Sequence, residues 1–174
     1  MMDTAACVAW WRRLQPNLPD GSPNPTGDRG TIARLRRCAS VTEAMQEKAA
    51  IDLFHALGCK NPRDLTVVGL AAAVLATVRQ ADTVRFPRAI GPTDPAHPET
   101  ARVKPLRFRR LMEAATPDER LMAFRRAIGL VDGAANLFSL SEALLNWNED
   151  LRLRWIYEYW SATERRDTAP ATAA

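Results

Sequence analysis

Arginines stand in pairs and triplets within short segments of this sequence. The grouped residues are Arg36 with Arg37, Arg107 with Arg109 and Arg110, and Arg125 with Arg126. A guanidinium group is a planar fork of N–H donors that can hold a phosphate through two parallel hydrogen bonds. The chemistry that these residues predict is therefore contact with phosphate groups.

Composition alone does not separate this hypothesis from a simpler one. The net charge is only +4, and Lys48, Lys60 and Lys104 are the only lysines among the 24 basic residues. A GC-rich coding sequence would also enrich arginine, and one arginine pair by itself is usually a solvated helix face. Three predicted helices carry arginines beside their apolar stripes, however. If these helices pack side by side, they would form a groove that neutralises several phosphates.

Catalytic chemistry has no comparable signal. The sequence lacks a glycine-rich phosphate loop, a GxSxG motif and an HExxH motif. The two histidines, His55 and His97, and the three cysteines, Cys7, Cys38 and Cys59, show no metal-ligand or disulfide spacing. We therefore predict no catalytic residue, no metal and no cofactor, and a reduced compartment.

The amino-acid sequence also shows no pattern typical of a targeting signal or of a membrane-spanning helix. The N-terminal segment lacks the basic start and uninterrupted apolar run of a signal peptide. The longest apolar stretch, residues 65–78, has roughly 14 residues, fewer than the 20 or so that a bilayer requires. We predict a cytoplasmic protein without membrane contact, in which this stretch is a buried helix.

The hydrophobic pattern predicts an all-α fold. Apolar residues recur at spacings of three and four, and no segment shows the sustained alternation of a strand. About eight helices are expected, near residues 4–15, 28–39, 40–57, 61–79, 106–115, 116–132, 139–147 and from 150 onward. Asp28 is a predicted N-cap. Three capping boxes are expected at Ser40 with Glu43, Thr116 with Glu119 and Ser139 with Glu142.

A proline-rich stretch divides the predicted helices into two groups. Residues 82–105 contain five prolines, and connections of that length are usually functional or disordered. We therefore predict a two-lobed helical bundle. Its parts are an N-terminal lobe (1–81), a proline-rich linker or loop (82–105), a C-terminal lobe (106–163) and a disordered tail (164–174).

The order of several motifs resembles the CasB family, the small helical subunit of the type I-E CRISPR surveillance complex called Cascade. The motifs are a tryptophan helix, GDRGTIARLRR (27–37), RFRRLM (107–112), LMAFRRAIGLV (121–131) and LLNWNEDLRLRWIYEYW (144–160). Each motif is individually weak, but together they cover nearly the whole chain. The proline-rich stretch 82–105 departs from the family pattern, in which a shorter connection with more glycine is expected.

The resemblance implies a non-catalytic subunit that stabilises the DNA opened by the complex. Its implied partners are the backbone and large subunits of Cascade, a second copy of itself, the guide RNA and both strands of the target DNA. Base pairing with the guide RNA would read the sequence, so the protein would need only backbone contacts. The matching positions are Arg29, Arg36, Arg37, Arg107, Arg125 and Arg126, and helix geometry adds Arg109 and Arg110.

Two alternatives to nucleic-acid binding remain. In the first, the chain is a helical protein–protein interaction module whose arginines pair with acidic residues of a partner. Trp10, Trp11 and Trp160 could belong to such an interface, where tryptophan is enriched. The second, a helix-turn-helix regulator, is disfavoured because no tight glycine turn precedes a polar reading helix. Salt-dependent binding to DNA would separate the first alternative from the main hypothesis.

Overall fold

The computed structural model describes residues 2–161, and apart from one two-stranded sheet the regular elements in this part of the chain are helices. The predicted tail, 164–174, lies outside the described residues. The helices are α1 (Thr4–Leu14), α2 (Arg29–Arg37), α3 (Val41–Met45), α4 (Lys48–Ala56), α5 (Asp64–Leu75), α6 (Phe86–Ile90), the 3-10 helix η1 (Pro98–Thr100), α7 (Pro105–Glu113), α8 (Pro117–Gly129), α9 (Leu137–Leu145) and α10 (Glu149–Trp160). The all-α prediction is confirmed.

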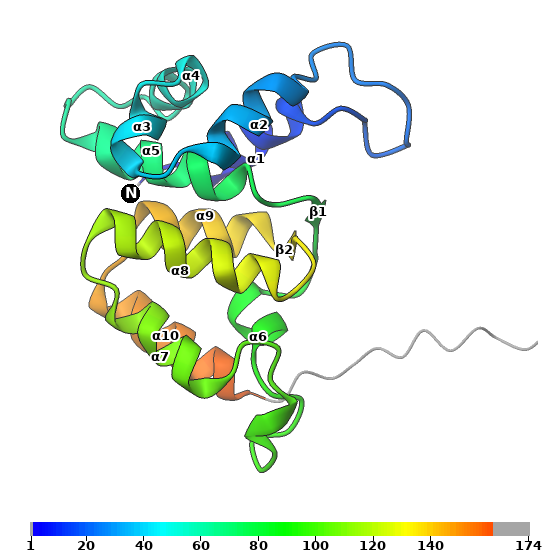
Figure 1. Cartoon of the computed structure of the whole chain (residues 1–174), viewed down its shortest axis with the longest axis vertical. Coiled ribbons are helices and arrows are strands. Elements are labelled where there is room, and N and C mark those ends of the chain that lie inside the picture. The colour runs from blue at the N-terminus through cyan, green and yellow to red at the C-terminus, as the bar shows by residue number, and fades with distance from the viewer. Residues whose placement is uncertain (1, 162–174) are drawn as a thin grey trace, which may run out of the picture.

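The helices are arranged around α5, which is the most apolar of them. Residues 68–75 of α5 are all buried, and α3, α4, α8 and α9 pack around it. In Figure 1, α1 to α5 lie at the top, α8 and α9 in the middle, and α6, α7 and α10 below. The predicted buried helix in 65–78 is therefore confirmed. One hydrophobic core runs from Cys7 in α1 to Tyr159 in α10.

A short parallel sheet joins the two halves of the chain. Strand β1 (Gln80–Ala81) follows the turn after α5, and β2 (Ala134–Ala135) follows the turn after α8. Gln80 pairs with Ala134 and Ala81 with Ala135. The sheet fixes the end of α5 beside the end of α8, which positions the site described below. The division into separate lobes stays a prediction.

The proline-rich stretch 82–105 is folded onto the core rather than forming only an open loop. It contains α6, whose Phe86 and Ile90 are fully buried, and α6 packs on α10. The phenol of Tyr159 donates a hydrogen bond to the Val103 carbonyl over 2.6 Å. Gly91 lies so close to α10 that an added Cβ would stand 2.0 Å from the Tyr159 carbonyl oxygen. Buried aromatic contacts thus outweigh the local effect of the prolines.

The predicted helix caps at Asp28 and Thr116 are correct. Asp28 accepts the Thr31 N–H over 2.8 Å, and Thr116 with Glu119 forms the predicted capping box. The predicted box at Ser139 is wrong, because α9 begins at Leu137 and is capped by Asn136. The Ser139 hydroxyl is buried and accepts the Phe86 N–H over 2.9 Å.

Trp10 and Trp11 are core residues, so their predicted place in a protein interface is wrong. Both side chains are buried because α1 is covered by α4 and α9. Their indole N–H groups donate to the carbonyls of Ala49 and Val78, at 2.8 and 3.3 Å.

Among the described residues, no helix is both long and apolar enough to cross a membrane.

Candidate nucleic-acid interface

The three arginine-bearing helices lie next to one another. In Figure 1, α8 lies between α2 above and α7 below. Helix α7 packs on α8, and hydrogen bonds from Arg125 of α8 reach the last turn of α2. The three helices are thus close enough to act together, and hollows that contain arginine lie on both sides of α8.

The principal hollow lies where α2, α5 and α8 end. It has a volume of about 360 Å³. Its lining residues are Arg36, Thr77, Arg79, Arg125, Ile128, Gly129, Asp132 and Gly133. Three arginines and one aspartate therefore line the hollow, which gives it an excess of positive charge. A negatively charged group would balance that excess.

Arg36 is the predicted residue that best suits contact with an anion in this hollow. Its Nε donates to the Ala76 carbonyl over 2.6 Å, which orients the guanidinium group at the end of α5. Its terminal nitrogens make no hydrogen bond within residues 2–161. Partial burial, and then the positive charge of Arg79, lower the pKa of Arg36 from its ordinary value. An anion between Arg36 and Arg79 would relieve that repulsion.

Arg79 completes the pair, although sequence analysis did not select it. Its aliphatic chain lies across Gly133, where an added Cβ would stand 3.0 Å from the Arg79 Cγ. The Arg79 N–H donates to the Gly133 carbonyl over 2.8 Å, next to the β1–β2 pairing. The only signal in the sequence was an arginine directly after the most apolar helix, where a charged side chain must turn outward.

Arg125 has a structural role in the same hollow. Its terminal nitrogens donate to the carbonyls of Cys38, Leu35 and Ala73, at 2.7, 2.8 and 3.3 Å. The carbonyls at a helix C-terminus lack partners within the helix and carry partial negative charge. Arg125 therefore holds the end of α2 to the end of α5 and so positions Arg36. Burial lowers the pKa of Arg125, and its Nε is buried without a partner in the described residues.

Arg110 and Arg126 share a second hollow, of about 540 Å³, between α7 and α8. Three carboxylates, those of Glu113, Asp118 and Glu119, line it with the two arginines. Negative charge therefore exceeds positive charge there. A phosphate at this hollow would meet repulsion as well as attraction.

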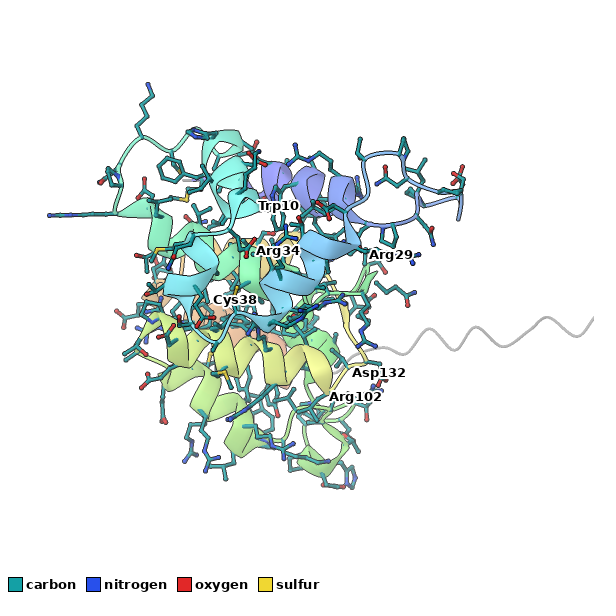
Figure 2. The ribbon with its side chains drawn as sticks, turned by 45° about the horizontal axis from the view of Figure 1, so that its top comes forward. Trp10, Arg29, Arg34, Cys38, Arg102 and Asp132 are labelled. Carbon is teal, nitrogen blue, oxygen red and sulfur yellow. The ribbon has the colours of Figure 1, made fainter. Side chains whose placement is uncertain are left out.

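Arg37 lines a third hollow, between α2 and α3, in which charges of the two signs are balanced. Its other charged residues are Arg34, Glu43 and Glu47, and Arg34 forms an ion pair with Glu47 at 3.1 Å. Figure 2 shows Arg34 beside Cys38 on this side of α2. Of the three hollows, only the one at Arg36 and Arg79 combines several arginines with a single carboxylate.

The remaining predicted residues are exposed and separate from these hollows. Arg29 lies at the N-terminal end of α2, as Figure 2 shows, while Arg36 lies near the other end. Arg107 and Arg109 are exposed on α7. Their side chains make no hydrogen bond or ion pair to residues 2–161. The predicted single groove is thus replaced by separate hollows with exposed arginines around them.

The fold of this protein is shared with a class of small all-α proteins whose structures have been solved. A chain in the crystal structure of E. coli Cascade bound to a PAM-containing dsDNA target matches with a TM-score of 0.63 and 18% identity, over 91% of this chain and 95% of that one. CasB from Thermus thermophilus matches with a TM-score of 0.63 and 24% identity, over 92% and 99%. A second Thermus thermophilus structure, of a CRISPR-associated protein of the Cse2 family, matches with a TM-score of 0.63 and 23% identity over the same shares. At these identities the matches establish a shared fold.

The family follows from the sequence match. The family model for CRISPR-associated protein Cse2 matches residues 31–160, and the chain belongs to this family. The resemblance to the CasB family is thereby confirmed. A comparison with curated protein sequences gave no significant match.

Proposed function

We propose that this protein is the non-catalytic small subunit of a Cascade-type, RNA-guided complex, in which its arginines contact the phosphates of target DNA. Membership of the CRISPR-associated Cse2 family supports this role. So does the similar fold of a chain in E. coli Cascade bound to a dsDNA target. The observation that carries the proposal is the hollow that is lined by Arg36, Arg79 and Arg125 and by a single carboxylate residue.

In this proposal the arginines have different roles. Arg36 and Arg79 contact a phosphate directly, because their terminal nitrogens make no hydrogen bond in the described part of the chain. Arg125 positions them through its bonds to helix ends. Arg29, Arg37, Arg107, Arg109, Arg110 and Arg126 provide weaker contacts along neighbouring stretches of DNA backbone. Such contacts carry no base information, which suits a complex in which guide RNA reads the sequence.

A stripe on α10 supports contact with other protein subunits. Leu153, Ile156, Tyr157 and Trp160 recur at spacings of three and four, and their exposed fractions are 59, 40, 72 and 38%. A row of exposed apolar side chains on one helix is typical of a protein interface. We propose backbone and large subunits, or a second copy of this chain, as its partners in the cytoplasm. The stripe also favours the alternative function, an interaction module without nucleic-acid contact.

Co-purification from the native host separates the two functions. Tagged wild type, the double variant Arg36→Ala with Arg79→Ala, and the control Arg63→Ala are compared for bound guide RNA, partner subunits and retention of target DNA. Arg63 is an exposed arginine that lines none of the three hollows. We expect RNA and partners with all three proteins, and loss of target DNA with the double variant alone. If wild type elutes without RNA or partners, the subunit assignment fails. If the double variant retains DNA as well as the control, the hollow is not a phosphate site.

A further inference from the structure

Asp132 supplies the only carboxylate among the residues that line the Arg36–Arg79 hollow. It lies in the turn after α8 with a φ of 57°, and it is the one non-glycine residue between 2 and 161 with a positive φ. Its N–H donates to Gly129, and the following Gly133 N–H donates to Ile128. This turn places Asp132 at the edge of the hollow.

The backbone of this turn does not require a negative charge. Glycine, asparagine and aspartate are the residues that adopt a left-handed conformation most readily. Asparagine would therefore allow the same turn with a neutral side chain. The charge of Asp132 thus has an effect on the hollow that is separate from the role of the residue in the turn.

Arg102 partly neutralises this carboxylate from outside the hollow. Its terminal nitrogen lies 3.0 Å from the Asp132 carboxylate, and its Nε donates to the Leu130 carbonyl. Figure 2 shows the two residues together at the end of α8. The Asp132 side chain is 90% exposed, and an ion pair so open to water is weak. Arg102 therefore offsets only part of the repulsion between Asp132 and an incoming anion.

We propose that Asp132 limits the affinity of the hollow for phosphate, and that Arg102 partly relieves this limit by pairing with Asp132. The inference rests on the proposed function, since it assumes that Arg36 and Arg79 bind a phosphodiester group. Its consequence is a hollow that holds a nucleic-acid backbone loosely by itself. Tight retention then requires the additional contacts of the assembled complex.

The size of the effect follows from Coulomb's law. At a partly hydrated surface, removing one negative charge from beside an anion site should tighten binding about two- to tenfold at low salt. The gain should shrink as added salt brings the screening length to about 10 Å or less.

The test uses the full-length chain and a fluorescein-labelled single strand of DNA, about 20 nucleotides long, which spans at least one typical binding site. Fluorescence anisotropy at low salt gives the affinities of wild type, Asp132→Asn, Arg102→Gln and the double variant. We expect Asp132→Asn to tighten binding and Arg102→Gln to weaken it. The loss caused by Arg102→Gln should be smaller in the Asp132→Asn background.

Two results would overturn the inference. Binding by Asp132→Asn that is unchanged or weaker than wild type excludes a limit set by Asp132. An equal loss from Arg102→Gln in both backgrounds shows that Arg102 does not act through Asp132. Where wild type binds below detection, the same series is measured in the assembled complex, and an unchanged affinity for Asp132→Asn there rejects the inference.

The double variant Arg36→Ala with Arg79→Ala separates this inference from the proposed function. If it loses affinity while Asp132→Asn matches wild type, the phosphate site stands and only the role of Asp132 is rejected. If it binds as wild type does, the phosphate site and the inference fail together. Circular dichroism and thermal unfolding check that each variant is folded, so that differences in affinity are not caused by unfolding.

Discussion

Replacing Arg125 with alanine tests whether this arginine holds the fold together or contacts nucleic acid only. The substitution removes hydrogen bonds from one guanidinium group to Cys38, Leu35 and Ala73, two of which lie at 2.7 and 2.8 Å. A hydrogen bond to a charged group contributes about 1.5 to 3 kcal/mol, and water replaces part of that loss at helix ends. We therefore expect the free energy of unfolding to fall by about 2 to 4 kcal/mol.

Urea and thermal unfolding measure this loss, with Arg126→Ala as the matched control. Arg126 is the next residue in the same helix, is exposed, and makes no side-chain hydrogen bond in the described residues. For a chain of this length the Arg125 variant should lose about 5 to 15 °C in Tm. The control should stay within about 0.5 kcal/mol of wild type. Equal stabilities for the two variants would refute the structural role of Arg125.

Three further changes test the packing of α10 and the buried thiol. Gly91→Ala forces a Cβ against the Tyr159 carbonyl, 2.0 Å away, and should cost about 3 kcal/mol or more in urea unfolding. Glu158→Gln weakens the pair in which Arg85 Nε lies 2.8 Å from a nearly buried carboxylate, and should cost about 1 to 3 kcal/mol in the same assay. Burial raises the pKa of the Cys7 thiol to about 12, so iodoacetamide should label it in unfolded but not in native protein at mildly alkaline pH. Because the unfolded chain releases this proton first, stability should fall as pH rises from 9.0 toward about 12, and Cys7→Ala should flatten part of that fall.

Local patterns predicted the elements whose structure depends mainly on their own residues. The apolar run 65–78 is buried as the central helix, and Thr116 and Glu119 are close enough in sequence to form their capping box within one turn. The cap of α9 could not be predicted in the same way. Ser139 and Asn136 are both good capping residues, and a hydrogen bond from Phe86, 53 positions away, leaves Ser139 inside the helix.

The site was only partly predictable, because its arrangement depends on where three helices end. Arg36 was predicted from its neighbours in sequence, and its place in the hollow agrees with a role in anion contact. Arg79 was missed because only the β1–β2 pairing brings it to the end of α8. The position of Arg125 was visible in the sequence. Its hydrogen-bond acceptors are the carbonyls at the ends of α2 and α5. They could not be predicted from the sequence, because backbone groups carry no residue-specific signal.

Helix geometry also explains why the arginine pairs overstate the number of phosphate contacts. Adjacent residues in an α-helix point about 100° apart, so both members of a pair cannot face one backbone track. Arg125 binds helix ends while Arg126 lines the hollow between α7 and α8, and Arg36 and Arg37 likewise line different hollows. Phosphate contacts should therefore be fewer than arginines. For single-stranded DNA, losing Arg36 and Arg79, which share one phosphate, should reduce the slope of log K against log salt by about 0.7. A variant that loses affinity with no change in this slope would mean that the two arginines support the fold rather than neutralise phosphate.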